Sequence, residues 1–206
     1  MVKCFKTNKV IVRRFQMKDA RDVFFNLSQK DEIEDSSNST EYLSNHSIEK
    51  ARMIIKSAIN EYYTDEPIWA VEDKMNKELV GSIRVTNYSR KNKMCNITWN
   101  MSYKYLDNTF MKEGLAQILK FLFIKKHIEL VECSFYENNK NMSTIVEGIG
   151  MTKEAILRDR RINEKTHKKE SYIIYSINKN EFLKFFNEQL IYLSKNKICN
   201  NVKRKI

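Results

Sequence analysis

Proline and glycine are scarce in this sequence, which has one proline and four glycines among 206 residues. Both residue types concentrate in turns and flexible linkers, so their scarcity argues against a long linker between domains. Hydrophobic residues make up 42% of the chain and charged residues 31%, a balance typical of a globular protein and not of a disordered one. The length fits one domain with a sizeable core.

The sequence also lacks the patterns of a metal site, a disulfide framework and a membrane span. The cysteines form no CxxC pair and the histidines show no ligand spacing; they are Cys4, Cys95, Cys133, Cys199, His46, His127 and His167. The longest apolar stretch is too short for a bilayer and is interrupted by Lys120. The N-terminus has no apolar segment typical of a signal peptide. We therefore expect no metal, no membrane association and a cytoplasmic location.

Charge is the one compositional feature that points toward a partner. The formal net charge is +11, and Lys and Arg side chains can neutralise nucleic-acid phosphates. The basic residues are spread along the whole chain, however, and Lys, Asn and Ile are frequent throughout. A composition bias therefore explains the charge better than a nucleic-acid site does, and a phosphorylated cofactor would also suit local positive charge.

Hydrophobic periodicity predicts the order β-α-α-β-β-β-α-β-α-β-β-α. The expected strands are 9–15, 67–74, 78–88, 94–106, 129–137, 152–162 and 170–178. The expected helices are 17–29, 47–63, 139–150, 180–195 and one that the turn at 109–114 leads into and that ends near Lys126. The helix between the strand ending near Leu106 and the strand beginning at Glu129 is a βαβ crossover, which implies a parallel pair inside a mixed sheet. The predicted fold class is α/β, a single domain with helices on both faces of the sheet.

The stretch TFMKEGLAQILKFLF, residues 109–123, begins at the carboxyl end of a predicted strand and leads into the crossover helix. Ligands of open α/β sheets collect at the carboxyl ends of strands, and the free amides of a helix N-terminus attract anions. Gly114 stands where the turn is expected to join the helix. The alternative is a tight turn in which Gly114 only supplies a positive φ, and spacing alone does not decide between the two.

Four stretches, taken in order, resemble the GNAT acyltransferase superfamily, in particular its ribosomal-protein N-acetyltransferase-like branch. VIVRRFQMKDARDVF is similar to the opening strand and helix, and IWAVEDKMNKELVGSIRV to the following hairpin. YLDNTFMKEGLAQIL resembles the acetyl-CoA loop, and ENNKNMSTIVEGIGM the block that runs from an asparagine to a glycine. The resemblance implies a GNAT-like domain over residues 1–180. Residues 181–206 are expected to form an amphipathic helix and basic tail packed on the same domain.

The resemblance implies acetyl transfer from acetyl-CoA to an amine, without a covalent enzyme intermediate. It places the pyrophosphate on the backbone amides at the start of the crossover helix and the pantetheine arm against the preceding strand end. Asn139 matches the asparagine that holds the pantetheine arm. The residues implied in cofactor binding are Tyr105, Leu106, Met111, Lys112, Glu113, Gly114, Leu115, Ala116 and Asn139. On this basis, Gly114→Val is expected to abolish CoA binding and leave the fold intact.

The catalytic residues follow the family pattern less closely. Met111 stands where Arg or Gln is usual, and Met142 where a serine often protonates the leaving thiolate. Ser143 and Tyr136 are candidate proton donors for that thiolate, and Glu72 and Glu132 are candidate general bases. For both glutamates the alternative is a charge on a strand surface or a hairpin.

The acceptor side is suggested only by an acidic segment. Residues 30–46 contain Asp31, Glu32, Glu34, Asp35 and Glu41, which would suit a protein N-terminus, a polyamine or an aminoglycoside; the alternative is a solvated charged loop. We adopt an acetyl-CoA-dependent N-acetyltransferase as the reading. Two alternatives stay open: a CoA-binding module without turnover, and a basic RNA- or ribosome-associated protein that uses the NVKRKI tail. Homodimer formation is also left open.

Overall fold

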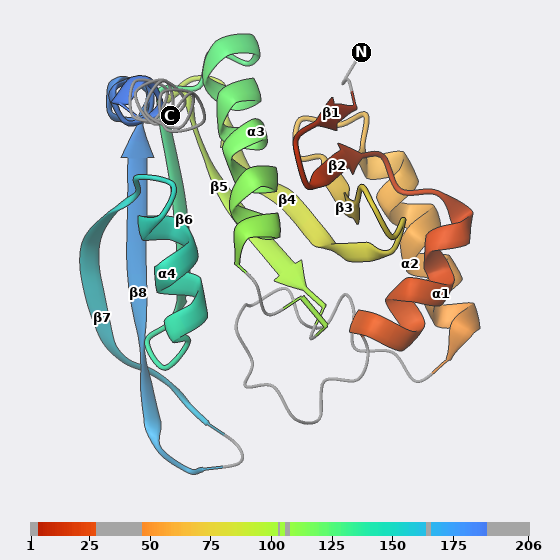
Figure 1. The fold of residues 1–206 in the computed structure, drawn as a ribbon. Helices are drawn as coiled ribbons and strands as arrows, with labels where there is room; N and C mark the ends of the chain where they lie inside the picture. The colour runs from red at the N-terminus through yellow and green to blue at the C-terminus, as the bar shows by residue number, and fades with distance from the viewer. Residues whose placement is uncertain (1–3, 28–46, 103, 106–107, 164–165, 189–206) are drawn as a thin grey trace, which may run out of the picture.

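The computed structural model describes residues 4–27, 47–102, 104–105, 108–163 and 166–188. Eight strands form one sheet in the order β1-β2-β3-β4-β5-β6-β8-β7 (Figure 1). The strands are β1 Phe5–Lys6, β2 Val10–Arg13, β3 Ile68–Asp73, β4 Leu79–Ser89, β5 Met94–Met101, β6 Leu130–Tyr136, β7 Thr152–Ile162 and β8 Lys169–Asn178. The helices are η1 Met17–Asp19, α1 Ala20–Asp22, η2 Val23–Leu27, α2 Ile48–Glu61, α3 Thr109–Lys125 and α4 Lys140–Glu147.

The sheet is mixed, as the sequence predicts. Strands β1 to β5 follow one another as antiparallel neighbours, and β6, β8 and β7 form a second antiparallel set. The two sets meet where β5 and β6 pair in parallel, and α3 connects these two strands. The βαβ crossover and the predicted α/β class with a mixed sheet are therefore confirmed.

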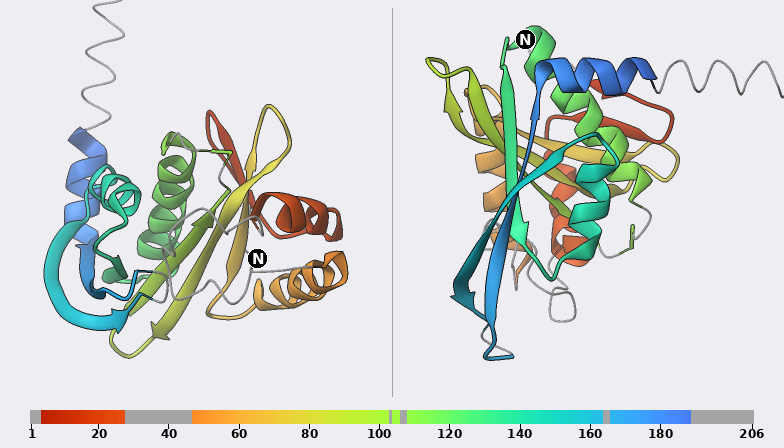
Figure 2. Two further views of the ribbon diagram at one scale, coloured as in Figure 1. Left: turned by 90° about the horizontal axis from the view of Figure 1, so that it is seen from below. Right: turned by 90° about the vertical axis from the view of Figure 1, so that its left-hand side faces the viewer.

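Helices cover both faces of the sheet. Figure 2 shows α3 and α4 on one side and α1 and α2 on the other. The larger core lies between the sheet and the α3–α4 layer and includes Trp69, Ile83, Ile97, Trp99, Leu115, Leu119 and Phe135. The smaller core lies under α1 and α2 and includes Phe15, Val23, Ala51, Ile55, Ile68 and Leu79. Alternation along β5 sends Cys95, Ile97 and Trp99 to the α3 side, which leaves polar residues on the opposite face.

The N-terminal elements follow the prediction with two differences. Ser47 caps α2 as expected, since its hydroxyl accepts a hydrogen bond from the Lys50 amide at 3.1 Å. The single helix predicted over 17–29 is instead three short segments, η1, α1 and η2. Strand β1 was not predicted, because two residues are too few to show an alternation.

The first turns of the C-terminal helix pack on the same body as α3. Residues 179–188 are helical, and the buried Phe182 ring lies 5.3 Å from the Phe123 ring of α3. The NVKRKI tail and the acidic segment 30–46 lie outside the described residues. In the part of the chain that is described, no helix is long and apolar enough to span a membrane.

Candidate active site

The sheet opens between its two central strands. β5 and β6 pair only through Met94–Asn96 and Leu130–Glu132. Beyond these residues β5 continues to Met101 and β6 to Tyr136, each still paired with its outer neighbour but not with the other. The two strands therefore border a wedge that opens toward their carboxyl ends. Its backbone edges can pair with an extended ligand as a strand would.

A glycine on β4 helps to keep the end of β5 away from β6. Gly81 lies opposite Met101, and a Cβ built on Gly81 would stand 2.0 Å from the Asn100 carbonyl oxygen. Only a residue without a Cβ allows the two backbones to approach this closely. The carboxyl end of β5 therefore stays with β4, on one side of the wedge.

The N-terminus of α3 is not capped by a side chain. Its N-cap residue, Asn108, makes no capping hydrogen bond, and the buried Oδ1 atom of Asn108 has no partner among the described residues. The Lys112 amide donates to the Asn108 carbonyl at 3.0 Å and so begins the intrahelical ladder. The amides that an anion can reach at this helix end precede Lys112, as those of Phe110 and Met111 do.

The start of α3 suggests a different position for the anion site from the one that the sequence predicts. The sequence analysis put the pyrophosphate on the amides of Lys112 to Ala116, with Gly114 at the join between turn and helix. In the structure α3 begins at Thr109, so Lys112–Ala116 lie inside the helix. We therefore expect the pyrophosphate to contact backbone amides about one helical turn nearer to the N-terminus than the sequence predicts.

The side chains of this segment mostly attach α3 to the sheet. Met111 and Leu115 are fully buried in the core, and Ala116 is half-buried. The Glu113 carboxylate accepts a hydrogen bond from the Lys9 amide at 3.0 Å, which ties α3 to the start of β2. The unusual Met111, which replaces the polar residue common in the family, is therefore a packing residue.

Lys112 spans the space between α3 and α4. Its Cε and Nζ atoms lie so close to Gly148 that a Cβ there would stand 2.7 Å from each of them. A cation is favoured at this place because Gly148 follows the C-terminal end of α4, which carries partial negative charge. Lys112 thus brings one positive charge to the rim between the two helices.

Asn139 forms the N-cap of α4 and keeps its amino group for another partner. Its Oδ1 atom accepts a hydrogen bond from the Met142 amide at 3.2 Å. In the described part of the chain, the Nδ2 atom of Asn139 has no partner, so two N–H donors remain between β6 and α4. This arrangement fits the family role of an asparagine that holds the pantetheine arm.

Ser143 belongs to a polar group that the sequence analysis did not identify. The Tyr175 hydroxyl, on β8, donates to Oε1 of Glu147 at 2.8 Å, and the Ser143 hydroxyl lies near the same phenol. Burial, as the main cause, raises the pKa of Tyr175; the nearby Ser143 hydroxyl lowers it and the Glu147 carboxylate raises it. Tyr175 was missed because its strand reads as an ordinary buried strand.

The structure separates the two candidate proton donors. The Phe135 ring stacks on Tyr175 on the α4 side of the sheet, so its neighbour Tyr136 points to the opposite face. There the Tyr136 ring contacts Tyr172 at 4.2 Å and the Arg161 guanidinium at 3.4 Å. Of these two residues, only Ser143 lies on the same face of the sheet as the N-terminus of α3.

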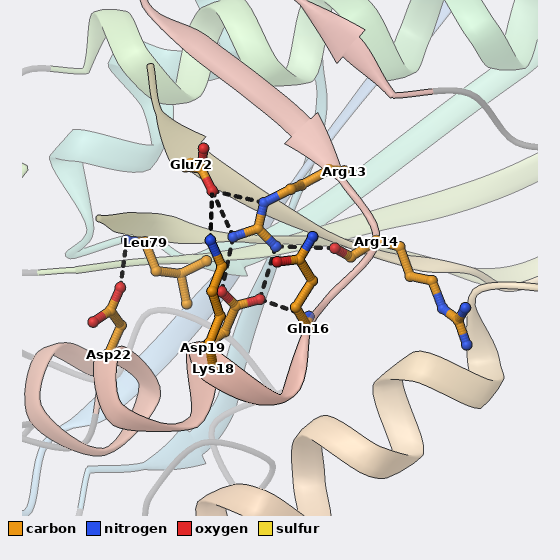
Figure 3. A network of polar contacts seen from close by, with 8 residues as sticks. All are labelled: Arg13, Arg14, Gln16, Lys18, Asp19, Asp22, Glu72 and Leu79. Atoms are coloured by element: carbon orange, nitrogen blue, oxygen red, sulfur yellow. Dashed lines mark hydrogen bonds and ion pairs between the residues drawn. The ribbon is translucent and has the colours of Figure 1, made fainter. Parts of the chain in front are cut away.

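Glu72 is part of a buried ion-pair network. Nε of Arg13 donates to Glu72 at 2.8 Å, and the same guanidinium binds both carboxylate oxygens of Asp19 (Figure 3). Burial lowers the pKa of Arg13, but hydrogen bonds and charge pairing with Asp19 and then Glu72 outweigh it and raise the pKa above its ordinary value. Glu72 therefore joins β2, β3 and η1, and its charge is committed to Arg13.

Glu132 lies where β5 and β6 part. It is half-buried on β6, opposite Asn96 of β5 and Ser176 of β8. Its neighbours Val131 and Cys133 are buried on the α3 side, so Glu132 points to the other face. Of the two candidate bases, Glu132 is the one at the wedge, and the described residues show it no ion-pair partner.

Tyr105 and Leu106, which were expected to pair with pantetheine, lie beyond the end of β5. β5 ends at Met101, and the Tyr105 amide donates to the Ser102 carbonyl in a turn. The Tyr105 hydroxyl donates to the buried Asp73 at 3.1 Å; burial first, and then Asp73, raises the pKa of Tyr105. The edge open to a ligand is therefore Ile97–Met101, and Leu106 lies outside the described residues. No metal-binding cluster occurs among the residues that the structure places.

Comparisons with known proteins agree with this geometry. The family model described as an acetyltransferase (GNAT) domain matches residues 9–152. The uncharacterized N-acetyltransferase YoaA of Bacillus subtilis (strain 168) is 25% identical over 162 residues, which cover 77% of this chain and 88% of that protein.

Solved acetyltransferases have the same fold. The ribosomal-protein-S5-alanine acetyltransferase of Vibrio fischeri superposes with a TM-score of 0.71 at 12% identity, over 88% of this chain and 99% of that one. The Microcin C7 self-immunity acetyltransferase MccE, solved with acetyl-CoA and AMP, gives a TM-score of 0.69 at 14% identity, over 84% and 93% of the chains. The structure shows a wedge between parallel strands beside an uncapped helix, and the family model matches most of the chain. This chain therefore belongs to the GNAT acetyltransferase family and is an N-acetyltransferase.

Proposed function

We propose that the chain transfers the acetyl group of acetyl-CoA to the neutral amine of a cationic acceptor, by direct attack when both substrates are bound. The observation that carries this proposal is the wedge between β5 and β6, which opens beside the uncapped N-terminus of α3. An extended arm rich in amides suits the first feature, and a diphosphate suits the second. Acetyl-CoA joins both groups in one molecule.

The chain's own residues fit this co-substrate at three places. The strand edge Ile97–Met101 supplies backbone partners for the arm, and the Nδ2 atom of Asn139 supplies side-chain donors. The Phe110 and Met111 amides lie at the positive end of the α3 dipole, and Lys112 adds a charge at the same rim. Acetyl-CoA brings the activated acetyl group; these residues bind and orient it.

The acid–base roles follow from position. As the amine nitrogen bonds to the acetyl carbon, the carbon–sulfur bond breaks, the nitrogen loses a proton and the sulfur gains one. Glu132, which lies at the vertex of the wedge, is proposed to take the proton from the amine. Ser143 is proposed to give a proton to the sulfur; it lies beside the Tyr175 phenol, whose own proton is donated to Glu147.

The acceptor is proposed to be a protein N-terminus or a small cationic amine. A carboxylate at the vertex, Glu132, favours an acceptor that arrives as a cation and must lose a proton before it attacks. Among the structural neighbours, one is named for acetylating an alanine of ribosomal protein S5, and that activity is stated of the neighbour only. The cytoplasmic location, the domain boundary at residue 180 and the homodimer stay predictions.

The test is an acetyl-CoA titration by calorimetry, followed by an acceptor screen that measures release of the free CoA thiol. We expect saturable binding and turnover with N-terminal peptides, polyamines or aminoglycosides. Binding without turnover on any of these amines would instead support a CoA-binding module. Absence of binding, together with a steeply salt-dependent affinity for RNA, would support the RNA-associated alternative.

A further inference from the structure

A second concave site lies at the end of the sheet away from the wedge. It is a hollow of about 360 Å³, formed where the β4–β5 turn meets the C-terminal end of α3. Its lining includes Arg90, Lys93, Lys125, Lys126 and His127. The wedge opens at the carboxyl ends of β5 and β6, whereas this hollow lies at their amino ends and shares no residue with the proposed acetyl-CoA site.

Backbone geometry fixes two of these basic residues at the rim. Lys93 has φ 52° and His127 has φ 55°, both in the left-handed region that glycine and asparagine adopt at less cost. The Glu129 amide donates to the Lys93 carbonyl at 2.7 Å, which ties the β4–β5 turn to the segment after α3. A lysine and a histidine are thus held in conformations that a smaller residue would suit better, and both line the hollow.

The positive charge in the hollow is poorly compensated. The lining residues include no Asp or Glu. The Asp65 carboxylate lies 3.3 Å from Lys126 and 3.5 Å from Arg90, so one anion serves two cations, and the Glu66 carboxylate accepts from the Tyr88 amide at 3.0 Å. Within the described ranges, neither Lys93 nor Lys125 has an ion-pair partner. The negative end of the α3 dipole favours Lys125 and Lys126.

We propose that this hollow binds a small anion that carries two or more phosphate groups. Neighbouring Lys and Arg side chains suit phosphate oxygens. An anion with a second phosphate can neutralise more of these positive charges than a single carboxylate can. The volume lies within the range of small-ligand sites. Tyr88 and Ile128 add an apolar wall, with the Lys126 Nζ atom 5.8 Å from the Tyr88 ring centroid. The site therefore takes a polyphosphate, or a phosphorylated molecule with a flat apolar part.

The test uses the full chain, uniformly labelled with ¹⁵N, saturated with acetyl-CoA and titrated with sodium tripolyphosphate. We expect saturable chemical-shift changes at the Lys93 and His127 amides. The double variant Lys93→Gln, Lys125→Gln is expected to raise the Kd for tripolyphosphate by about tenfold or more, because each lost charge removes a charge-assisted contact. Acetyl-CoA turnover is expected to stay unchanged.

The matched control is the double variant Lys153→Gln, Lys168→Gln, which removes the same charge from two exposed lysines elsewhere. An equal loss of affinity in both double variants would show an effect of net charge alone and overturn the proposal. So would an absence of saturable shifts at Lys93 and His127. A second arm titrates a short single-stranded oligonucleotide; binding of the oligonucleotide without binding of tripolyphosphate would replace the small-anion site with a nucleic-acid surface. Each readout is local to the hollow, so none depends on where acetyl-CoA binds.

Discussion

At the scale of single residues, burial and pairing distinguish two glutamates that look equivalent in the sequence. Glu72 contacts Arg13, and the side chains of these two residues are 7% and 10% exposed. We predict that Glu72→Gln lowers the free energy of unfolding by about 1.5–3 kcal/mol, the value of a hydrogen bond to a charged group. The loss stays in this range because Asp19 still neutralises Arg13. Urea unfolding measures it.

Glu132→Gln is the matched variant, and it should lower kcat while leaving the free energy of unfolding nearly unchanged. Without an ion pair to break, its free energy of unfolding should change by no more than about 0.5 kcal/mol. Its kcat should fall by about 10²-fold or more, as expected for loss of a general base. Glu72→Gln should keep its kcat once the folded fraction is taken into account. A fall in kcat with Glu72→Gln and none with Glu132→Gln would reverse the assignment.

Gly114 illustrates a residue whose role changes once its surroundings are known. A Cβ on Gly114 would lie 3.3 Å from Cδ1 of Ile83 and 3.5 Å from Cγ1 of Val71. We predict that Gly114→Ala changes the free energy of unfolding by less than about 1 kcal/mol, because the gain in helix propensity offsets a small displacement of Ile83. Gly114→Val should destabilise by about 1–3 kcal/mol, since its extra methyl groups overpack the core. Thermal unfolding of the two variants measures both.

The sequence predicts that Gly114→Val abolishes CoA binding with the fold intact, whereas the packing of Gly114 against Ile83 predicts a loss of stability. Calorimetry with acetyl-CoA on the Gly114→Ala variant is the decisive control. If this stable variant loses affinity by a large factor, the Gly114 backbone lies at the ligand after all, and the shift of the anion site by one turn is wrong.

At the scale of elements, a polar contact connects α4 to β8 and supports the chemistry assigned to Ser143. We predict that Ser143→Ala lowers kcat by roughly 10²-fold, the low end for general acid catalysis, with little change in the KM for acetyl-CoA. Tyr175→Phe should lower kcat by a smaller factor, because the ring still packs on Phe135 and only the hydroxyl is lost. Steady-state kinetics with both substrates separates the two constants.

The double variant of Ser143 and Tyr175 tests whether the two hydroxyls act in sequence. If they do, the double variant should be little worse than Ser143→Ala alone, since their effects then are not additive. Thr144→Ala provides the control, because Thr144 is exposed on the same helix and bonds only the Lys140 carbonyl. Strictly additive losses, or an equal loss with Thr144→Ala, would mean that α4 is merely perturbed.

The elements themselves could largely be predicted, and the failures have physical causes. The β3–β4 hairpin, the crossover helix and the α2 cap at Ser47 follow from local alternation, periodicity and capping chemistry. The start of α3 does not, because Gly114 resembles a turn residue and only tertiary packing shows that it fills a narrow space against Ile83. The contact of Tyr175 with α4 joins residues 28 positions apart, and no local pattern encodes it.

At the scale of the whole molecule, the sheet consists of two antiparallel sets joined by a short parallel segment. β1 to β5 form one set and β6, β8 and β7 the other, and the two sets pair only through Met94–Asn96 and Leu130–Glu132. Packing of α3 and α4 in the larger core also connects the two sets. A ligand in the wedge would contact both sets of strands. It would therefore stabilise the junction between them, where β5 and β6 share few backbone pairs.

This arrangement predicts how acetyl-CoA changes stability and local opening. At a concentration one hundred times its Kd, acetyl-CoA should raise the free energy of unfolding by about 2.7 kcal/mol through mass action. Hydrogen exchange should slow most at the strand edge Ile97–Met101 and at the first turn of α3, where amides gain partners. The β7–β8 hairpin, on the far side of the second set, should gain only the protection that follows from global stability. Protection spread evenly over both sets would place the ligand outside the wedge, because binding at the wedge must protect its own edges first.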